Sequence, residues 1–159
     1  MQNDITLKIA LDSFGIYIKR TSKMLDGFSD ELLEQEVSPN KNTGHYLLGH
    51  LIAVHDNMLP LLGFGESLYP QLAEVFIKNA DKSALQKPSI VQLRAQWNEV
   101  NTLLLSNLEL LTATQWFEKH TAVSDEDFAK EPHRNKLNVV LSRTSHLAYH
   151  VGQLALLKQ

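Results

Sequence analysis

The stretch Ile90–Leu111, IVQLRAQWNEVNTLLLSNLELL, carries the clearest structural pattern in this chain. Apolar side chains recur along it every three or four residues, which is the spacing of one face of an α-helix. Ser89 precedes the stretch and is a favoured N-cap residue. We therefore expect a helix that starts at Ser89 and packs one continuous apolar seam into a core. The seam consists of Ile90, Leu93, Trp97, Val100, Leu104, Leu108 and Leu111.

Three other segments share this period, from about Asp4 to Leu25, Thr43 to Leu62 and Asn138 to Leu157. No stretch alternates apolar and polar residues with period two, and no Asn-Gly or Asp-Gly hairpin signal is present. The sequence therefore predicts an all-α fold, a four-helix bundle. We expect residues 1–159 to form one domain, with a short extra helix at Leu68–Ile77 and irregular structure at Thr121–Lys136.

Composition excludes several classes of protein. The chain is 43% apolar and 21% charged, with a net charge of −3, and its basic residues are scattered, so we expect no nucleic-acid partner. It has no cysteine, which removes disulfides, zinc–thiolate sites and cysteine nucleophiles. No apolar run is long enough to span a membrane. The start, Met1-Gln2-Asn3-Asp4, lacks the features of a secretory signal, so we expect a cytoplasmic protein.

Three histidines form a candidate metal site. His146 and His150 lie four residues apart, and such residues share one face of a helix. Both border the apolar face of the last segment, and His50 points to the apolar side of the second. Burying three imidazoles near an apolar seam is costly unless each finds a partner. One divalent cation would serve all three; separate half-buried histidines with partners of their own are the alternative.

The other four histidines have no predicted role. By helical-wheel position, His45 and His55 are expected at the surface or boundary of the second segment. His120 and His133 lie in polar connecting segments.

Polar residues near the predicted ligands are candidates for supporting roles. Gln153 lies one turn beyond His150 and could orient a ligand or a bound water. Arg143 lies one turn before the first histidine of this pair and could hold a substrate carboxylate. Asn57 lies two turns from the histidine of the second segment and could support it, although a helix-surface role is preferred. Tyr149 points away from the ligands, which favours packing or a dimer contact.

Three strings in the chain look like family motifs. They are, in order, Phe28-Ser29-Asp30-Glu31-Leu32-Leu33, Tyr46-Leu47-Leu48-Gly49-His50-Leu51 and Ser145-His146-Leu147-Ala148-Tyr149-His150-Val151-Gly152-Gln153-Leu154. Through them the chain resembles the DinB/YfiT-like superfamily over nearly its whole length. The resemblance implies a four-helix bundle of the up-down-down-up type, often dimeric, with His50, His146 and His150 as ligands for Ni²⁺, Zn²⁺ or a similar ion. Characterised relatives include bacillithiol S-transferases and mycothiol-dependent maleylpyruvate isomerases. The isomerases usually carry a further C-terminal domain; this chain ends after its last predicted helix, so we expect it outside that subgroup.

Three neutral imidazoles leave an open face on a bound ion, as in catalytic zinc sites. A low-molecular-weight thiol could bind there, lose its proton and attack an electrophilic small molecule. A bound water could instead hydrolyse a substrate. The first hypothesis is favoured, because the chain lacks the glutamate of His-Glu-x-x-His. A non-catalytic dimeric bundle that binds a small molecule or a protein is the third reading, so the sequence leaves open whether the protein is an enzyme. We expect a homodimer.

Overall fold

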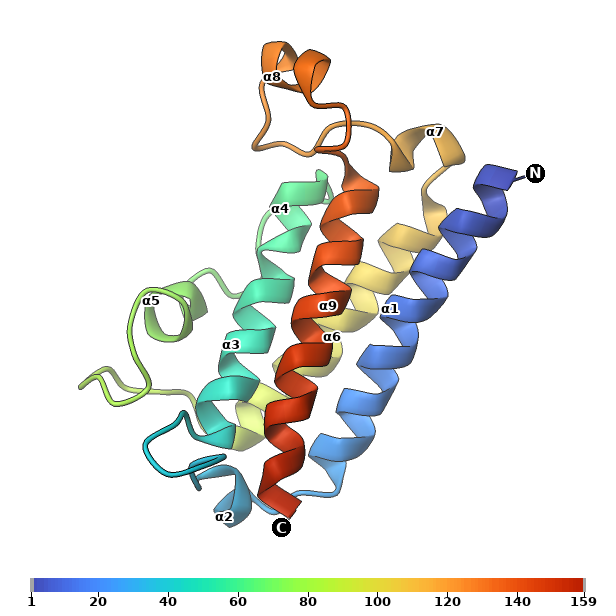
Figure 1. The fold of residues 1–159 in the computed structure, drawn as a ribbon. Helices are drawn as coiled ribbons and strands as arrows, with labels where there is room; N and C mark the ends of the chain where they lie inside the picture. Colours follow the sequence, from blue (N-terminus) through green and yellow to red (C-terminus); the bar gives the residue numbers. More distant parts are fainter. Residues whose placement is uncertain (1, 159) are drawn as a thin grey trace.

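Four long helices lie side by side in the computed structural model, which describes residues 2–158 and the side chains of residues 5–157 (Figure 1). Each of these helices packs against two others: α1 contacts α6 and α9, and α3 contacts the same two. Within residues 2–158 there is no β-strand, only two isolated β-bridges. The predicted all-α four-helix bundle is confirmed. The long helices are α1 (Gln2–Asp26), α3 (Gly44–Asp56), α6 (Ile90–Leu110) and α9 (Lys136–Leu154).

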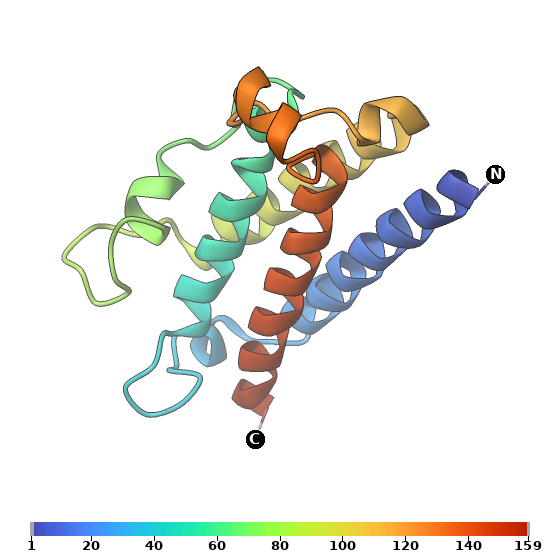
Figure 2. The same cartoon turned by 45° about the horizontal axis from the view of Figure 1, so that its top comes forward.

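The direction of the helices requires one long connection. In Figure 1, α1 and α9 run one way along the bundle, and α3 and α6 run the other way. Because α3 and α6 are neighbours with the same direction, the chain must return along the bundle between them. Residues 57–89 make this return and contain α4 (Met58–Leu62) and α5 (Leu72–Phe76). Helix α5 packs against α3, on the side away from α9 in the turned view of Figure 2.

Four short elements complete the chain. The hydroxyls of Ser29, Thr112 and Ser124 accept backbone N–H groups at the starts of α2, α7 and α8, as N-caps do. Helix α8 lies inside the stretch that was expected to be irregular. The short elements are α2 (Asp30–Leu33), α7 (Ala113–Trp116), α8 (Asp125–Lys130) and the 3₁₀ turn η1 (Ala155–Lys158).

The second predicted helix, Thr43–Leu62, is two helices in the structure. Helix α3 ends at Asp56, because Pro60 has no N–H to donate to the Asp56 carbonyl. The Ser67 hydroxyl donates to that carbonyl instead, at 3.3 Å. The third predicted helix begins where expected, since the Ser89 hydroxyl accepts the N–H of Gln92 at 3.3 Å. The short predicted helix at residues 68–77 is reduced to α5.

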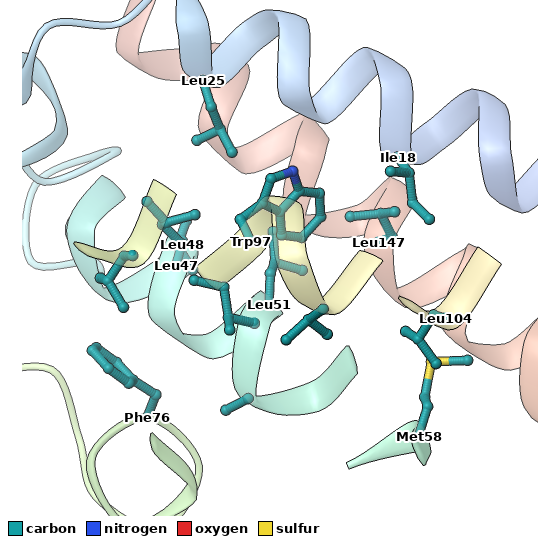
Figure 3. Close-up of a cluster of buried hydrophobic side chains, with 14 of the residues drawn as sticks. Ile18, Leu25, Leu47, Leu48, Leu51, Met58, Phe76, Trp97, Leu104 and Leu147 are labelled. Atoms are coloured by element: carbon teal, nitrogen blue, oxygen red, sulfur yellow. The ribbon is translucent and has the colours of Figure 1, made fainter. Parts of the chain in front are cut away.

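The core is centred on the apolar seam of α6. Its side chains are buried, except that Leu111 at the end is only half-buried. Trp97 is the largest of them, and its indole Nε1 donates to the Ser22 hydroxyl at 2.9 Å. Leucines from α3 and α9 surround the indole in Figure 3. No helix in the described part of the chain has the length and apolar character needed to cross a membrane.

Candidate metal centre

Three imidazoles meet in the gap between α3 and α9. The Nε2 atom of His146 lies 3.1 Å from Nε2 of His50 and 3.1 Å from Nε2 of His150. All three side chains are half-buried. Their ligand atoms lie within 4.8 Å of one another, and among the described residues this metal-type group contains no carboxylate. The structure therefore brings together the three histidines that the sequence singled out.

The ring of His50 is held from outside by α5. Its Nδ1 lies 2.8 Å from the Phe76 carbonyl oxygen, which can only accept, so Nδ1 donates. Helix α5 comes this close because Gly49 faces the Phe76 ring; a Cβ at Gly49 would lie only 2.4 Å from ring carbons. The Tyr46 ring lies nearly parallel to that of His50, at 11°. Sequence reasoning missed the Phe76 carbonyl, since a backbone acceptor has no side-chain signature.

The ring of His150 is held by its own helix. Gln153 Oε1 accepts from Nδ1 of His150 at 2.7 Å. Gln153 therefore contacts the predicted ligand directly, as a residue that orients this ring must. The Gln153 amide in turn donates to the Tyr149 hydroxyl at 3.2 Å. The Tyr149 ring also meets the His150 ring edge-on, with centroids 5.0 Å apart. Tyr149 is 63% exposed, yet it takes part in this network, which the sequence did not predict.

The three neutral imidazoles have too few protons to make both Nε2–Nε2 contacts hydrogen bonds. Because His50 and His150 carry their protons on Nδ1, both present bare Nε2 lone pairs to His146. A neutral His146 has one proton, so it can donate to only one of them. Its Nδ1 is buried and has no hydrogen-bond partner among the described residues. A cation that accepts three Nε2 lone pairs removes the conflict, so the residues present fit a divalent metal.

Burial favours the neutral form of two of the three imidazoles. Burial lowers the pKa of His146 to about 4, helped by repulsion from His150, His50 and nearby Arg143. Burial also lowers the pKa of His150, although its bond to Gln153 works in the opposite direction. At neutral pH both rings therefore carry free lone pairs, which is the form that binds metal.

The spacing of the nitrogens suits a tetrahedral ion. Zn–N bonds of about 2.0–2.1 Å place two imidazole nitrogens about 3.3 Å apart at the tetrahedral angle. The observed separations of 3.1 Å are close to this value. Three protein ligands leave a fourth position open for a substrate, as in catalytic rather than structural zinc sites.

The two other predicted supporting residues differ in where they lie. Arg143 is half-buried one turn before His146, and its Nε is buried without a hydrogen-bond partner among the described residues. Its charge lowers the pKa values of His146 and His55, so it lies near both. Asn57 is exposed between α3 and α4, and the structure gives it no bond to the histidines. The structure does not bring Asn57 to the site.

The surface positions expected for His45 and His55 are wrong. Both side chains are buried, at 7% and 0% exposure. His45 lies between the Glu34 carboxylate and the Pro88 carbonyl, at 2.9 and 2.8 Å. His55 packs among rings, and its Nδ1 lies 2.7 Å from Asn101 Oδ1. The reason is that α3 contacts α2, α5, α6 and α9, so it has almost no outer face.

Comparison with known proteins agrees with this site. A search of curated proteins found no match to the chain. The sequence profile of the DinB superfamily matches residues 17–154, which include all three histidines and the helices that carry them. On the strength of this match and of the three-histidine cluster, the chain belongs to the DinB superfamily.

Proposed function

We propose that this protein is a metal-dependent thiol S-transferase, which joins a low-molecular-weight thiol to an electrophilic small molecule. The observation that carries the proposal is the convergence of three Nε2 atoms, for which the neutral imidazoles have too few protons to form both contacts as hydrogen bonds. His50, His146 and His150 would hold the ion, and Ni²⁺ or Zn²⁺ suits a set of imidazole donors. A bound ion supplies one thing: it lowers the pKa of a coordinated thiol so that the thiolate is present at neutral pH.

The residues around the cluster would orient the ligand rings; they would not transfer protons. The Phe76 carbonyl and the Gln153 amide fix the orientation of two ligand rings, which keeps their Nε2 atoms directed at one point. Among the described residues the cluster contains no carboxylate that could act as general base. A thiol needs no such base once it is acidified, whereas zincin-type hydrolysis relies on one. The absence of a base in the cluster therefore supports thiol transfer over hydrolysis.

The reaction balances without a redox partner. The thiol S–H bond gives its proton to solvent, and the sulfur lone pair forms a bond to an electrophilic carbon. The bond from that carbon to its leaving group breaks, and the leaving group departs with the electron pair. With monochlorobimane as electrophile, the products are a thioether, chloride and a proton.

The proposal is tested with untagged protein loaded with Zn²⁺ or Ni²⁺. Bound metal is measured first, and then thiol transfer to monochlorobimane with cysteine, glutathione, bacillithiol and mycothiol. His146→Ala and His150→Ala should lose metal and thiol-dependent turnover together. His133→Ala, at an exposed position away from the cluster, is the matched control and should change neither.

Three outcomes would contradict the proposal. Protein that binds no metal after loading removes its basis. Turnover of activated esters without any thiol, lost in His150→Ala, would assign the site to a hydrolase. Metal binding with no turnover of either kind would favour a non-catalytic bundle that binds a small molecule or a protein.

A further inference from the structure

Arg143, a half-buried cation one turn before His146, has no partner among the described residues. Arg143 lies on α9, three residues before His146, and its side chain is half-buried. Within residues 5–157 no carboxylate or carbonyl accepts a hydrogen bond from it, and its Nε is enclosed. The other three arginines all have partners. Arg94 binds the Leu25 and Phe28 carbonyls and Asp30, Arg134 pairs with Glu131, and Arg20 lies over the Tyr17 ring.

No acidic side chain among the described residues neutralises the charge of Arg143. A charged group that is partly removed from water without a partner costs free energy, and burial already lowers the pKa of this guanidinium. A metal ion on the histidines would add more positive charge beside it. Arg143 therefore supports neither the fold nor metal binding by its charge, which leaves an anion from outside as its partner.

Arg143 lies close to the histidine cluster, so an anion bound to it would belong to a molecule that also reaches the cluster. Three residues correspond to about 4.5 Å along a helix axis, so Arg143 and His146 start less than one turn apart on α9. A second enclosed nitrogen, Nδ1 of His146, also has no partner in the described chain. A planar guanidinium binds a carboxylate through two parallel hydrogen bonds, and its charge does not depend on pH.

We propose that Arg143 is the anion-binding residue of this site, which holds the carboxylate of a substrate whose reacting atom lies at His50, His146 and His150. The inference rests on the proposed function for the reacting atom, but the carboxylate contact can be measured apart from any turnover. It assigns the site to small molecules that carry both a carboxylate and the reacting group.

The experiment is a calorimetric titration of the zinc-loaded protein with three probes. They are 3-mercaptopropionate, which has a thiol and a carboxylate; 2-mercaptoethanol, which has the thiol alone; and propionate, which has the carboxylate alone. The wild-type protein should bind 3-mercaptopropionate about tenfold to hundredfold more tightly than 2-mercaptoethanol, as a charge-assisted bidentate contact implies. Arg143→Gln should lose this preference and bind 2-mercaptoethanol as before. Arg143→Met, which keeps the apolar stem, provides a second uncharged variant if the first does not fold.

Two controls separate this contact from a structural effect. Arg20→Gln removes the same charge from an exposed site on α1 and should leave the preference intact. Zn²⁺ affinity of Arg143→Gln, measured by competition with a chelator, should not fall. A fall would indicate that Arg143 maintains the metal site, and would overturn the proposal.

The probes also distinguish the two proposals from each other. Equal binding of both thiols by the wild-type protein, or a preference that survives in Arg143→Gln, overturns the anion site. If neither thiol binds but propionate binds in an Arg143-dependent manner, the anion site stands and the thiol step of the proposed function falls. If none of the three probes binds, the anion site is overturned as well.

Discussion

The close approach of α5 to α3 can be tested at a single atom. Gly49 faces the Phe76 ring, and a Cβ at this position would lie 2.4 Å from two ring carbons and 2.6 Å from a third. Carbon atoms in contact normally lie about 3.5–4.0 Å apart, so in Gly49→Ala the ring must retreat by about 1 Å or more. Phe76 is fully buried and has little room to do so. Its carbonyl, which holds His50, would move with it.

The size of the effect follows from two opposing terms. Overpacking a well-packed core costs about 1–3 kcal/mol. Alanine in a helix gains about 0.5–1 kcal/mol over glycine. For Gly49→Ala we therefore expect a net loss of about 1–2 kcal/mol in the free energy of unfolding. Because the support of one ligand ring is displaced, the affinity for Zn²⁺ should also fall by about tenfold to hundredfold.

Urea unfolding followed by circular dichroism measures the first quantity, and competition with a chelator measures the second. Gly152→Ala is the matched control, since no atom lies within 4 Å of the position a Cβ would take there. That variant should be stabilised by about 0.5–1 kcal/mol, with unchanged Zn²⁺ affinity. If Gly49→Ala behaves like Gly152→Ala in both measurements, the tight contact between α5 and α3 does not exist in solution.

Three further predictions concern polar side chains with a defined hydrogen-bond partner. Gln153→Ala should weaken Zn²⁺ binding by about tenfold to hundredfold, measured by chelator competition, and unchanged affinity would show that the amide does not orient its histidine. Asp56→Ala should destabilise the protein by about 2–4 kcal/mol in urea unfolding, because its carboxylate accepts the N–H groups of Leu68 and Tyr69 at 2.7 and 2.8 Å; a loss below 1 kcal/mol would argue against those bonds. Burial lowers the pKa of His55 from 6.5 to about 4, so the unfolded state takes up a proton more readily than the folded state. The stability that His55 contributes should therefore be complete above pH 6.5 and fall by up to about 3 kcal/mol as the pH drops to 4. His55→Asn, which keeps a donor for its partner amide, should flatten this pH dependence, and an equally steep dependence in the variant would assign it to other groups.

The parts of the fold that the sequence predicted are those set by local pattern. The period of the third helix and the cap at Ser89 depend only on neighbouring residues, and both are confirmed. The break before α4 was missed because the pattern of apolar residues continues through it, while the proline at position 60 removes one backbone bond. The burial of His45 and His55 was also missed. It depends on how many elements surround α3, which no single-helix pattern contains.

The candidate site also has a part that local sequence pattern predicts and a part that depends on the tertiary fold. His146 and His150 share a face by helical geometry alone, and His50 was placed inward by its apolar neighbours. The acceptor at Phe76 could not be predicted, because it is a backbone oxygen brought in by the return segment. The homodimer, the cytoplasmic location, the identity of the metal and the thiol stay predictions. The contacts within one chain do not determine any of these four properties.

The topology explains why the histidine of α3 has a support from outside its own helix. Since α3 and α6 run in the same direction, the chain must pass back along α3, and this passage brings the Phe76 carbonyl to His50. Two buried carboxylates fix the ends of the passage. Asp56 accepts two backbone N–H groups where it begins, and Asp81 accepts the Thr43 N–H at 2.6 Å and pairs with a lysine near its end. Neither carboxylate touches a ligand ring, yet both restrict the position of the carbonyl that does. Loosening either end should therefore weaken metal binding as well as stability, because the return segment and the metal centre depend on the same contact.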